Sequence, residues 1–328
     1  MYPRGMPRSE ELRIRAGDAN LAGTLLLPDA PPPNDRRGRY PSALLLPSWL
    51  PRDRDGVYDR IGHRDWFAPT PMRPGLLARL ADALAAHGVA SLRADPRGCG
   101  SSKGAWEEVT LFAKIDDARD LLAALRGRRE LDLRRTGIVG HGEGAGIALA
   151  VAIGDPAVSA LTLIGASARS WRNTLRRAAA FRGREGTDHD HPIVAAIDRW
   201  SEDLIERAER QEPTCTLSLS GGSLVTLSLA AFEQAIRTPP QALATMLHRS
   251  VALVHGSRDA WSDPEETMLI AASLATGSDA PQARLIPGAG HDLSEASDGL
   301  IGEIADDLAA RLLPRDLPPV LVAIEEMG

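Results

Sequence analysis

Two ionisable residues and a run of glycines offer the chemistry in this sequence. Asp259 and His291 each follow a short apolar segment that predicts a buried strand, so both are expected in loops at strand ends. The run Gly140-His141-Gly142-Glu143-Gly144 follows a third such segment. A histidine oriented by a carboxylate can remove a proton from a hydroxyl group or from water. The residue types therefore point to base-assisted chemistry on a small molecule.

The glycine-rich run lies between an expected strand at 136–139 and a helix rich in Ala, Ile and Leu. A strand that enters a helix through so short a turn fits the pattern Gly-x-Ser-x-Gly, whose serine is a catalytic nucleophile. Gly142 stands where that serine would stand. The turn fits at every fixed position except the one that would attack.

Five motifs together resemble the α/β-hydrolases of the bacterial esterase and acyl-hydrolase type. They are the loop Asp53–Gly56, the turn Asp95–Ser102, the glycine-rich turn, His255-Gly256-x-x-Asp259 and Gly290-His291. The resemblance covers roughly residues 11–313. In that family the nucleophile, the acid and the histidine follow one another along the chain, as positions 142, 259 and 291 do here. The resemblance thus implies a catalytic pair of His291 and Asp259 beside Gly142, the nucleophile position.

The resemblance also places groups around this pair. The loop after the expected strand 42–46 contains Ser48 and Trp49 where the family usually has His-Gly and small residues. By position, the backbone N–H groups of Trp49 and Glu143 are the expected oxyanion donors. Ser48 is either a substitute hydroxyl beside the site or, as we favour, a polar part of the pocket wall.

Strands that alternate with helices predict an α/β fold: an α/β-hydrolase sheet of about eight mostly parallel strands, flanked by helices, with an N-terminal antiparallel hairpin. We expect the following divisions of the chain: a loose leader at 1–10, a core at 11–166 and 250–313, a mostly helical lid at 167–249, and a tail at 314–328. The alternation breaks in the lid segment, where residues 216–229 suit either a hairpin or a short helix. Trp171, Phe181 and Trp200 are expected to pack within this segment or to face the substrate, which favours an apolar or aromatic substrate.

Three functions are compatible with Gly142. In the first, His291 and Asp259 act on the substrate or on a water held in the empty space over Gly142, so that direct hydrolysis, cyclisation, elimination or isomerisation proceeds without a serine nucleophile. In the second, the chain is an inactive Ser-to-Gly variant of an ester or thioester hydrolase. In the third, it is a non-catalytic ligand-binding relative, which the retention of both His291 and Asp259 disfavours.

A different use of the same glycines is a dinucleotide site, because residues 140–145 also fit Gly-x-Gly-x-x-Ala. That site needs an acidic residue at the end of the next strand, where this chain has Ile164-Gly165-Ala166-Ser167. The tract Asp188–His191 resembles a metal-binding segment but has no further ligands nearby in the sequence. We therefore expect neither a cofactor nor a metal.

The composition limits the partners. The 328 residues carry a formal net charge of −6, which argues against a nucleic-acid partner. The N-terminus has no apolar signal segment, and the longest apolar run is too short for a membrane span. Two distant cysteines suggest no disulfide framework. These features predict a cytoplasmic enzyme with a small-molecule substrate and no membrane partner, and a homodimer is compatible with them.

Overall fold

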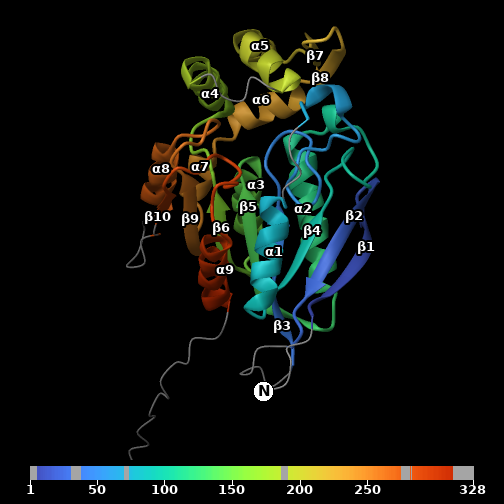
Figure 1. The fold of residues 1–328 in the computed structure, drawn as a ribbon, viewed down its shortest axis with the longest axis vertical. Coiled ribbons are helices and arrows are strands. Elements are labelled where there is room, and N and C mark those ends of the chain that lie inside the picture. The colour runs from blue at the N-terminus through green and yellow to red at the C-terminus, as the bar shows by residue number, and fades with distance from the viewer. Residues whose placement is uncertain are drawn as a thin grey trace, which may run out of the picture.

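The computed structural model describes residues 6–30, 38–69, 74–185, 191–274, 281 and 283–312. Within these ranges the centre of the molecule is a sheet of eight strands (Figure 1). In spatial order the strands are β1 (Arg8–Ala16), β2 (Ala19–Leu27), β4 (Ala90–Ala94), β3 (Tyr40–Leu46), β5 (Leu131–His141), β6 (Val158–Ile164), β9 (Ser250–Gly256) and β10 (Ala283–Ile286). Strands β1 and β2 pair antiparallel, β2 joins β4 antiparallel, and the remaining pairs are parallel. The predicted fold class is confirmed.

Helices cover both faces of the sheet. On one face lie α1 (Leu76–Ala86) and α9 (Asp298–Leu312), and on the other lie α2 (Leu111–Arg126), α3 (Glu143–Gly154) and α8 (Pro264–Leu274). Strand β3 shows why the sheet needs two covers: Leu44 and Leu46 point into the core of α2 and α3, whereas Ala43 and Leu45 point into the core of α1 and α9. An apolar strand without polar alternation is stable only between two helical layers.

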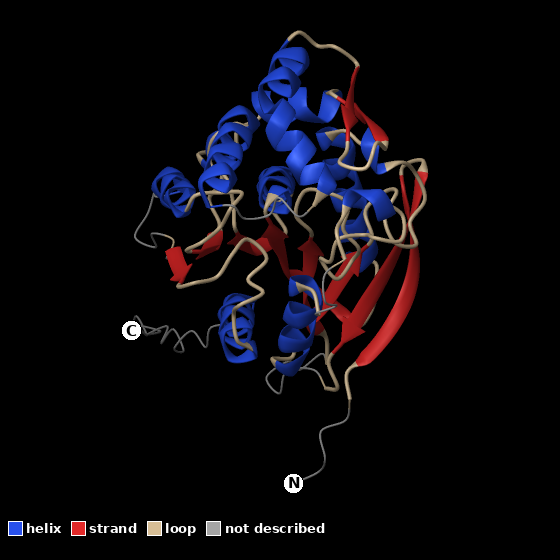
Figure 2. Ribbon diagram, turned by 45° about the horizontal axis from the view of Figure 1, so that its top comes forward, coloured by secondary structure: helices blue, strands red, loops and turns tan. Residues whose placement is uncertain are grey.

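A second group of elements lies beyond the carboxyl ends of the parallel strands, at the top of Figure 1. It comprises α4 (Trp171–Glu185), α5 (Pro192–Glu209), β7 (Thr214–Ser218), β8 (Leu224–Ser228), α6 (Ala230–Arg237) and α7 (Pro240–Ala244). We call its described residues between 171 and 244 the cap segment. Figure 2 shows its helices gathered above the sheet. A separate apolar cluster, which includes Ile193, Leu204 and Phe232, joins α4, α5, β7, β8 and α6, whereas Ala244 of α7 packs into the core on the side of α2 and α3.

The structure decides the ambiguous part of the cap segment in favour of a hairpin. Strands β7 and β8 pair antiparallel, with Thr216 opposite Thr226. Gly221 and Gly222 in the turn have φ angles of 113° and 89°, which only glycine adopts easily. The alternative of a helix from Ser223 is wrong, because alternate residues of both strands are buried, as a two-faced hairpin requires.

Some predicted boundaries need correction. Strand β1 begins at Arg8, so residues 8–10 belong to the sheet and not to the leader predicted at 1–10. Helix α9 begins only at Asp298, because turns occupy the preceding segment and Leu293 has a φ of 48°. Residues 1–5, the predicted tail from 314 and most of the Asp188–His191 tract lie outside the described residues. In the part of the chain that the structure describes, no helix has the length and apolarity of a membrane span.

Candidate active site

The glycine-rich turn joins β5 to α3 with very close backbone packing. Gly142 has φ 55° and ψ −116° and precedes the first residue of α3. A Cβ on Gly140 would lie 2.3 Å from the carbonyl oxygen of Gly144, and one on Gly144 would lie 2.6 Å from that of Pro47. A side chain at 140 or 144 would collide with the backbone, so these positions need glycine. The positive φ angle at 142 favours glycine there as well. Gly142 therefore lies in the tight strand-to-helix turn that the sequence predicts.

His291 and Asp259 form a hydrogen-bonded pair beside this turn. His291 Nδ1 lies 2.7 Å from Asp259 Oδ2, and both residues come from loops that follow adjacent strands, β10 and β9. The other carboxylate oxygen accepts the N–H groups of Trp261 at 2.7 Å and Ser262 at 2.9 Å. Asp259 is therefore fixed by its own loop, and it sets the orientation of the imidazole.

Burial and charge act in opposite directions on this pair. Burial alone would raise the pKa of Asp259, but the charge of His291 and hydrogen bonds from His255 and His291 hold the pKa well below its usual range. Burial alone would lower the pKa of His291, yet the Asp259 carboxylate outweighs burial and raises it. A carboxylate that stays ionised and an imidazole of raised proton affinity are the electrostatics of a general base.

Two further histidines, His141 and His255, support the pair and line neither of the two pockets that reach His291. His141 Nε2 lies 3.0 Å from the carbonyl oxygen of His291, and burial lowers the pKa of His141 to about 3, so it is neutral and donates this hydrogen bond. His255 Nε2 lies 3.0 Å from the carbonyl oxygen of Ser262 and 3.3 Å from Asp259. The sequence motifs around His141 and His255 do not reveal their part in holding the acid and the base. Their place at the ends of β5 and β9 was the available signal.

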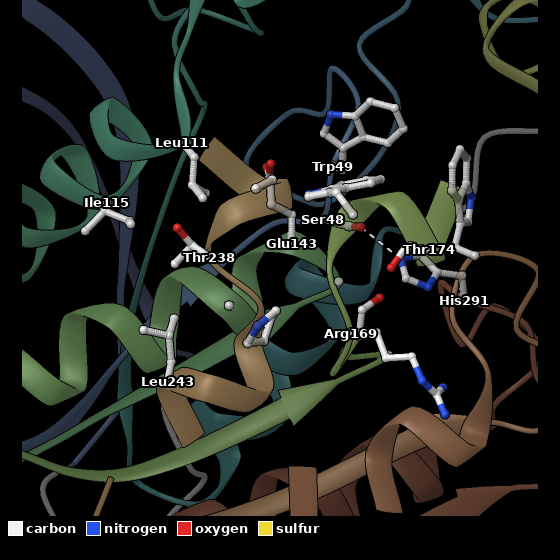
Figure 3. A pocket seen from close by; sticks show the side chains of 18 of the residues that line it. Ser48, Trp49, Leu111, Ile115, Glu143, Arg169, Thr174, Thr238, Leu243 and His291 are labelled. Carbon is white, nitrogen blue, oxygen red and sulfur yellow. Dashed lines mark hydrogen bonds between the residues drawn. The ribbon is translucent and has the colours of Figure 1, made fainter. Parts of the chain in front are cut away.

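Ser48 provides the least expected contact of the site. Its Oγ lies 2.8 Å from His291 Nε2, the nitrogen that Asp259 leaves free (Figure 3). A Cβ added to Gly142 would lie only 2.0 Å from this oxygen. The expectation of an empty, water-sized space over Gly142 is therefore wrong: the Ser48 side chain fills the volume that the missing side chain leaves.

The loop that carries Ser48 is held from several sides. Arg52 is 2% exposed, and its guanidinium donates to the carbonyl oxygens of Trp49 at 3.3 Å and Gly56 at 2.7 Å. It also donates to Asp292, the residue after His291, at 3.1 Å. Leu50 is held at φ 70°, a conformation that persists only where the surroundings impose it. Arg52 thus connects the loop of Ser48 to the loop of His291.

The oxyanion donors remain a prediction, and the structure describes their surroundings. Glu143 is the first residue of α3, so its N–H is among those that have no acceptor within the helix. Its carboxylate lies 2.7 Å from Lys114 Nζ and is thereby engaged in an ion pair. Trp49 directly follows Ser48, and its indole is buried. Both backbone amides are therefore adjacent in the chain to Ser48 or Gly142.

Ser48, Gly142 and His291 all line one pocket. Figure 3 shows Ser48 and His291 on its wall. The cap segment and the core contribute to it jointly, and its described lining includes Trp49, Leu111, Ile115, Trp171, Thr174, Thr238, Leu243 and Trp261. The wall is mostly apolar, with a few polar groups close to the base. Such a lining suits a small apolar or aromatic molecule that carries one reactive polar group.

The three aromatic residues predicted to pack in the cap segment or to face the substrate lie in different places. Trp171 lines this pocket, and its ring lies 4.5 Å from that of Trp49. Phe181 lines a second, neighbouring pocket that reaches His291 from another side. Trp200 is 43% exposed and lines neither of the two pockets in the described chain. Of these three residues, only Trp171 is therefore placed to touch a molecule over Ser48.

Trp49 is the centre of an aromatic cluster under the cap segment. Its ring lies 5.5 Å from Trp261, 5.8 Å from Phe232 and 6.4 Å from Trp106, mostly in edge-on or tilted contacts. Edge-to-face aromatic pairs contribute about 0.5–1.5 kcal/mol each beyond area burial. The bulky residue that stands where the family has small ones thus secures the cap segment over the site.

One group of side chains has the spacing of a metal site. Donor atoms of His141, His291 and Asp292 lie within 4.8 Å of one another. The guanidinium of Arg52, a permanent cation, donates to Asp292 at 3.1 Å, and His291 is already paired with Asp259. Because Arg52 supplies the positive charge at Asp292, these residues do not fit a resident cation, and we propose none.

Gly165 follows β6 and is expected to be sensitive to substitution. Its φ is 59°, and a Cβ there would lie 3.1 Å from Asp259 Oδ2, His291 Nδ1 and His291 Cε1. Gly165→Ala should therefore displace the acid–base pair and reduce kcat about tenfold or more, in line with the large losses that a small misplacement causes. Steady-state kinetics with circular dichroism as a folding check measure this. An unchanged kcat would show that the pair tolerates displacement.

The sequence of the chain matches a known protein family. Residues 61–303, more than half of the chain, match the family model described as "Alpha/beta hydrolase family". The chain belongs to the α/β-hydrolase family, and it is an enzyme of that family by sequence and by fold. No functionally curated protein matches the sequence.

Solved structures of the same fold cover nearly the whole chain. Est1E from Butyrivibrio proteoclasticus, solved with ferulic acid bound, is 16% identical with a TM-score of 0.61, over 92% of this chain and 98% of Est1E. The α/β hydrolase GrgF from Penicillium sp. sh18 is 16% identical with a TM-score of 0.60, over 93% and 98%. A putative hydrolase from Agrobacterium vitis S4 is 18% identical with a TM-score of 0.58, over 94% and 100%. At these identities the similarity establishes the fold alone.

Proposed function

We propose that this enzyme acts on an ester or related acyl or carbonyl compound, with His291 and Asp259 as the general base and with no side chain contributed by position 142. The observation that carries the proposal is the 2.7 Å contact between His291 Nδ1 and Asp259 Oδ2, which leaves Nε2 directed at the pocket. Hydrolysis is the reaction that we place first. The same base would also serve cyclisation, elimination or isomerisation.

The substrate class follows from the pocket. Trp171, Leu111 and Leu243 present apolar surface, and the amides of Glu143 and Trp49 are our candidates for stabilising a developing oxyanion. An apolar or aromatic acyl group suits this wall. Est1E, which shares the fold, is known with ferulic acid, an aromatic acid, bound. The cap segment would act as a lid that excludes water from the reaction.

The two alternatives are less well supported. A disabled serine hydrolase should keep room for the serine that it lost, but a Cβ at 142 would lie 2.0 Å from Ser48 Oγ and 2.8 Å from His291 Nε2. A binding protein without catalysis needs no carboxylate that raises the pKa of a buried histidine. The packing around Gly142 therefore favours a working enzyme that is adapted to glycine.

The test is hydrolysis of aryl esters of increasing acyl length and its dependence on pH. The base must be neutral to accept a proton, and the raised pKa of His291 keeps it protonated to a higher pH than usual. We expect kcat/KM to increase with pH through an apparent pKa above the ordinary value of about 6.5. A pH profile without this ascending limb, or no turnover of esters, thioesters or lactones, would contradict the proposal.

A further inference from the structure

We propose that Ser48 is the catalytic nucleophile of this enzyme, moved from the elbow to the loop after β3. The inference deepens the proposed function and rests on it, because it names the hydroxyl on which the His291 base acts. Ser48 is then the substitute hydroxyl that its position in the sequence allows, and not merely a polar part of the pocket wall. It also replaces the activated water expected over Gly142.

The first support is a continuous hydrogen-bonded relay. Asp259 Oδ2 lies 2.7 Å from His291 Nδ1, and His291 Nε2 lies 2.8 Å from Ser48 Oγ. An ionised carboxylate can only accept, so the proton of the neutral imidazole stays on Nδ1. Nε2 is then the acceptor, and Ser48 donates its hydroxyl proton to it. This is the order of contacts in a Ser-His-Asp triad.

The second support is that Ser48 occupies the nucleophile's volume. Its Oγ lies 2.0 Å from the place where a Cβ of residue 142 would lie, and its Cβ lies 2.9 Å from that place. A side chain at 142 and the observed position of Ser48 exclude each other. Glycine at 142 is therefore a condition for the Ser48 contact, which explains why the base and acid are kept while the elbow serine is absent.

The third support is access combined with rigidity. Ser48 is 8% exposed and lines the pocket, so its oxygen can meet a substrate carbon there. Arg52 holds the backbone of the same loop through the carbonyl oxygens of Trp49 and Gly56. A nucleophile must be held near its attacking position to gain from orientation, and this bracing supplies that.

A second serine of the pocket wall provides the contrast. Ser167 also lines the pocket, but its Oγ contacts Ser262 Oγ at 3.2 Å. No contact joins it to His291 in the part of the chain that the structure describes. The hydrogen bond to His291 therefore distinguishes Ser48 from Ser167, which is only a polar residue of the pocket wall.

The reaction balances with an ester and water as the reactants. Ser48 Oγ forms a bond to the acyl carbon while its proton passes to His291 Nε2. The bond from the acyl carbon to the alcohol oxygen breaks, and the leaving oxygen takes that proton from His291. Water then attacks the acyl-enzyme and gives a proton to His291, which returns it to Ser48 Oγ as the acid leaves.

The experiment uses the full chain, a fluorophosphonate reagent and p-nitrophenyl butyrate. Intact mass and peptide mapping locate the adduct in the wild type, Ser48→Ala, Ser48→Cys and Ser167→Ala, and turnover is measured in parallel. We expect the adduct on Ser48, its loss in Ser48→Ala with a fall in kcat/KM of about 10³-fold, and its retention in Ser167→Ala. Ser48→Cys should still form a butyryl-enzyme, now as a thioester.

The outcomes separate the two proposals. If Ser48→Ala kept full turnover and the ascending limb of the pH profile of kcat/KM, Ser48 would not be the nucleophile. His291 would then act as a base that activates water. An adduct on another residue would overturn this role of Ser48 too. Absence of both turnover and adduct in the wild type would overturn the nucleophile together with the proposed function. Circular dichroism of Ser48→Ala and Ser48→Cys ensures that loss of folding is not taken for loss of chemistry.

Discussion

Replacing His291 with alanine is expected to lower kcat/KM for aryl esters by about 10³-fold, because it removes the group that takes the proton from the attacking hydroxyl or water. Asp259→Asn should be comparably severe, with a loss of about 10³-fold, since an amide cannot stabilise the protonated imidazole or fix its tautomer. The pH dependence of kcat/KM is a second measurement of the same pair. Without the Asp259 charge, the pKa of His291 should fall, and the remaining ascending limb should shift to lower pH.

A matched control lies on the molecular surface. Asp306 pairs with His87 at 3.2 Å, but its side chain is 70% exposed, and it belongs to α9, which contributes no residue to the pocket lining. Asp306→Asn removes an Asp–His pair of the same kind and should leave kcat/KM unchanged, because exposed pairs contribute little. If His291→Ala kept the rate of the wild type, the general-base mechanism would have to be abandoned.

Restoring the serine of the family pattern is expected to damage this protein. Gly142→Ser places a side chain at φ 55°, which costs about 1–3 kcal/mol in strain. It also forces an overlap with Ser48 and His291, and overpacking of this kind costs about 1–3 kcal/mol more. We expect a marked decrease in the free energy of unfolding, measured with urea, together with reduced esterase activity. Vigorous activity would instead favour the disabled hydrolase.

Two further variants separate strain from overlap. Gly288 has a φ of 74°, and a Cβ there would meet nothing within 4 Å, so Gly288→Ser carries the strain alone. The double change Gly142→Ser with Ser48→Gly removes the two serine contacts that the single change creates. We expect the double variant to be more stable than Gly142→Ser. If the two variants unfold at the same urea concentration, the overlap with Ser48 is not the cause of the damage.

Much of this fold follows from local patterns. The strand–helix alternation predicts the eight-stranded sheet, and the positions of Asp259 and His291 after β9 and β10 predict their meeting at one sheet edge. These features depend on neighbours in the sequence and on the rule that parallel strands end together.

Other features depend on contacts between distant parts of the chain. Ser48 reaches His291 across 243 positions of sequence, and nothing in the motif Pro47-Ser48-Trp49 shows which way the hydroxyl points. That direction depends on Arg52, on the burial of Trp49 and on the absence of a side chain at 142. The choice between hairpin and helix at 216–229 likewise depended on which face the cap segment would bury.

The tryptophans around the pocket also give the protein an intrinsic fluorescence signal for ligand binding. Of the six tryptophans of the chain, Trp49, Trp171 and Trp261 line the pocket, whereas Trp200 is 43% exposed. Indole emission responds to polarity and to nearby quenching groups, so a molecule that enters the pocket is expected to change the fluorescence of these three tryptophans. Trp200→Phe removes the solvent-exposed emitter and leaves a signal weighted toward the site. Occupancy over Ser48 can then be followed without a label and without turnover.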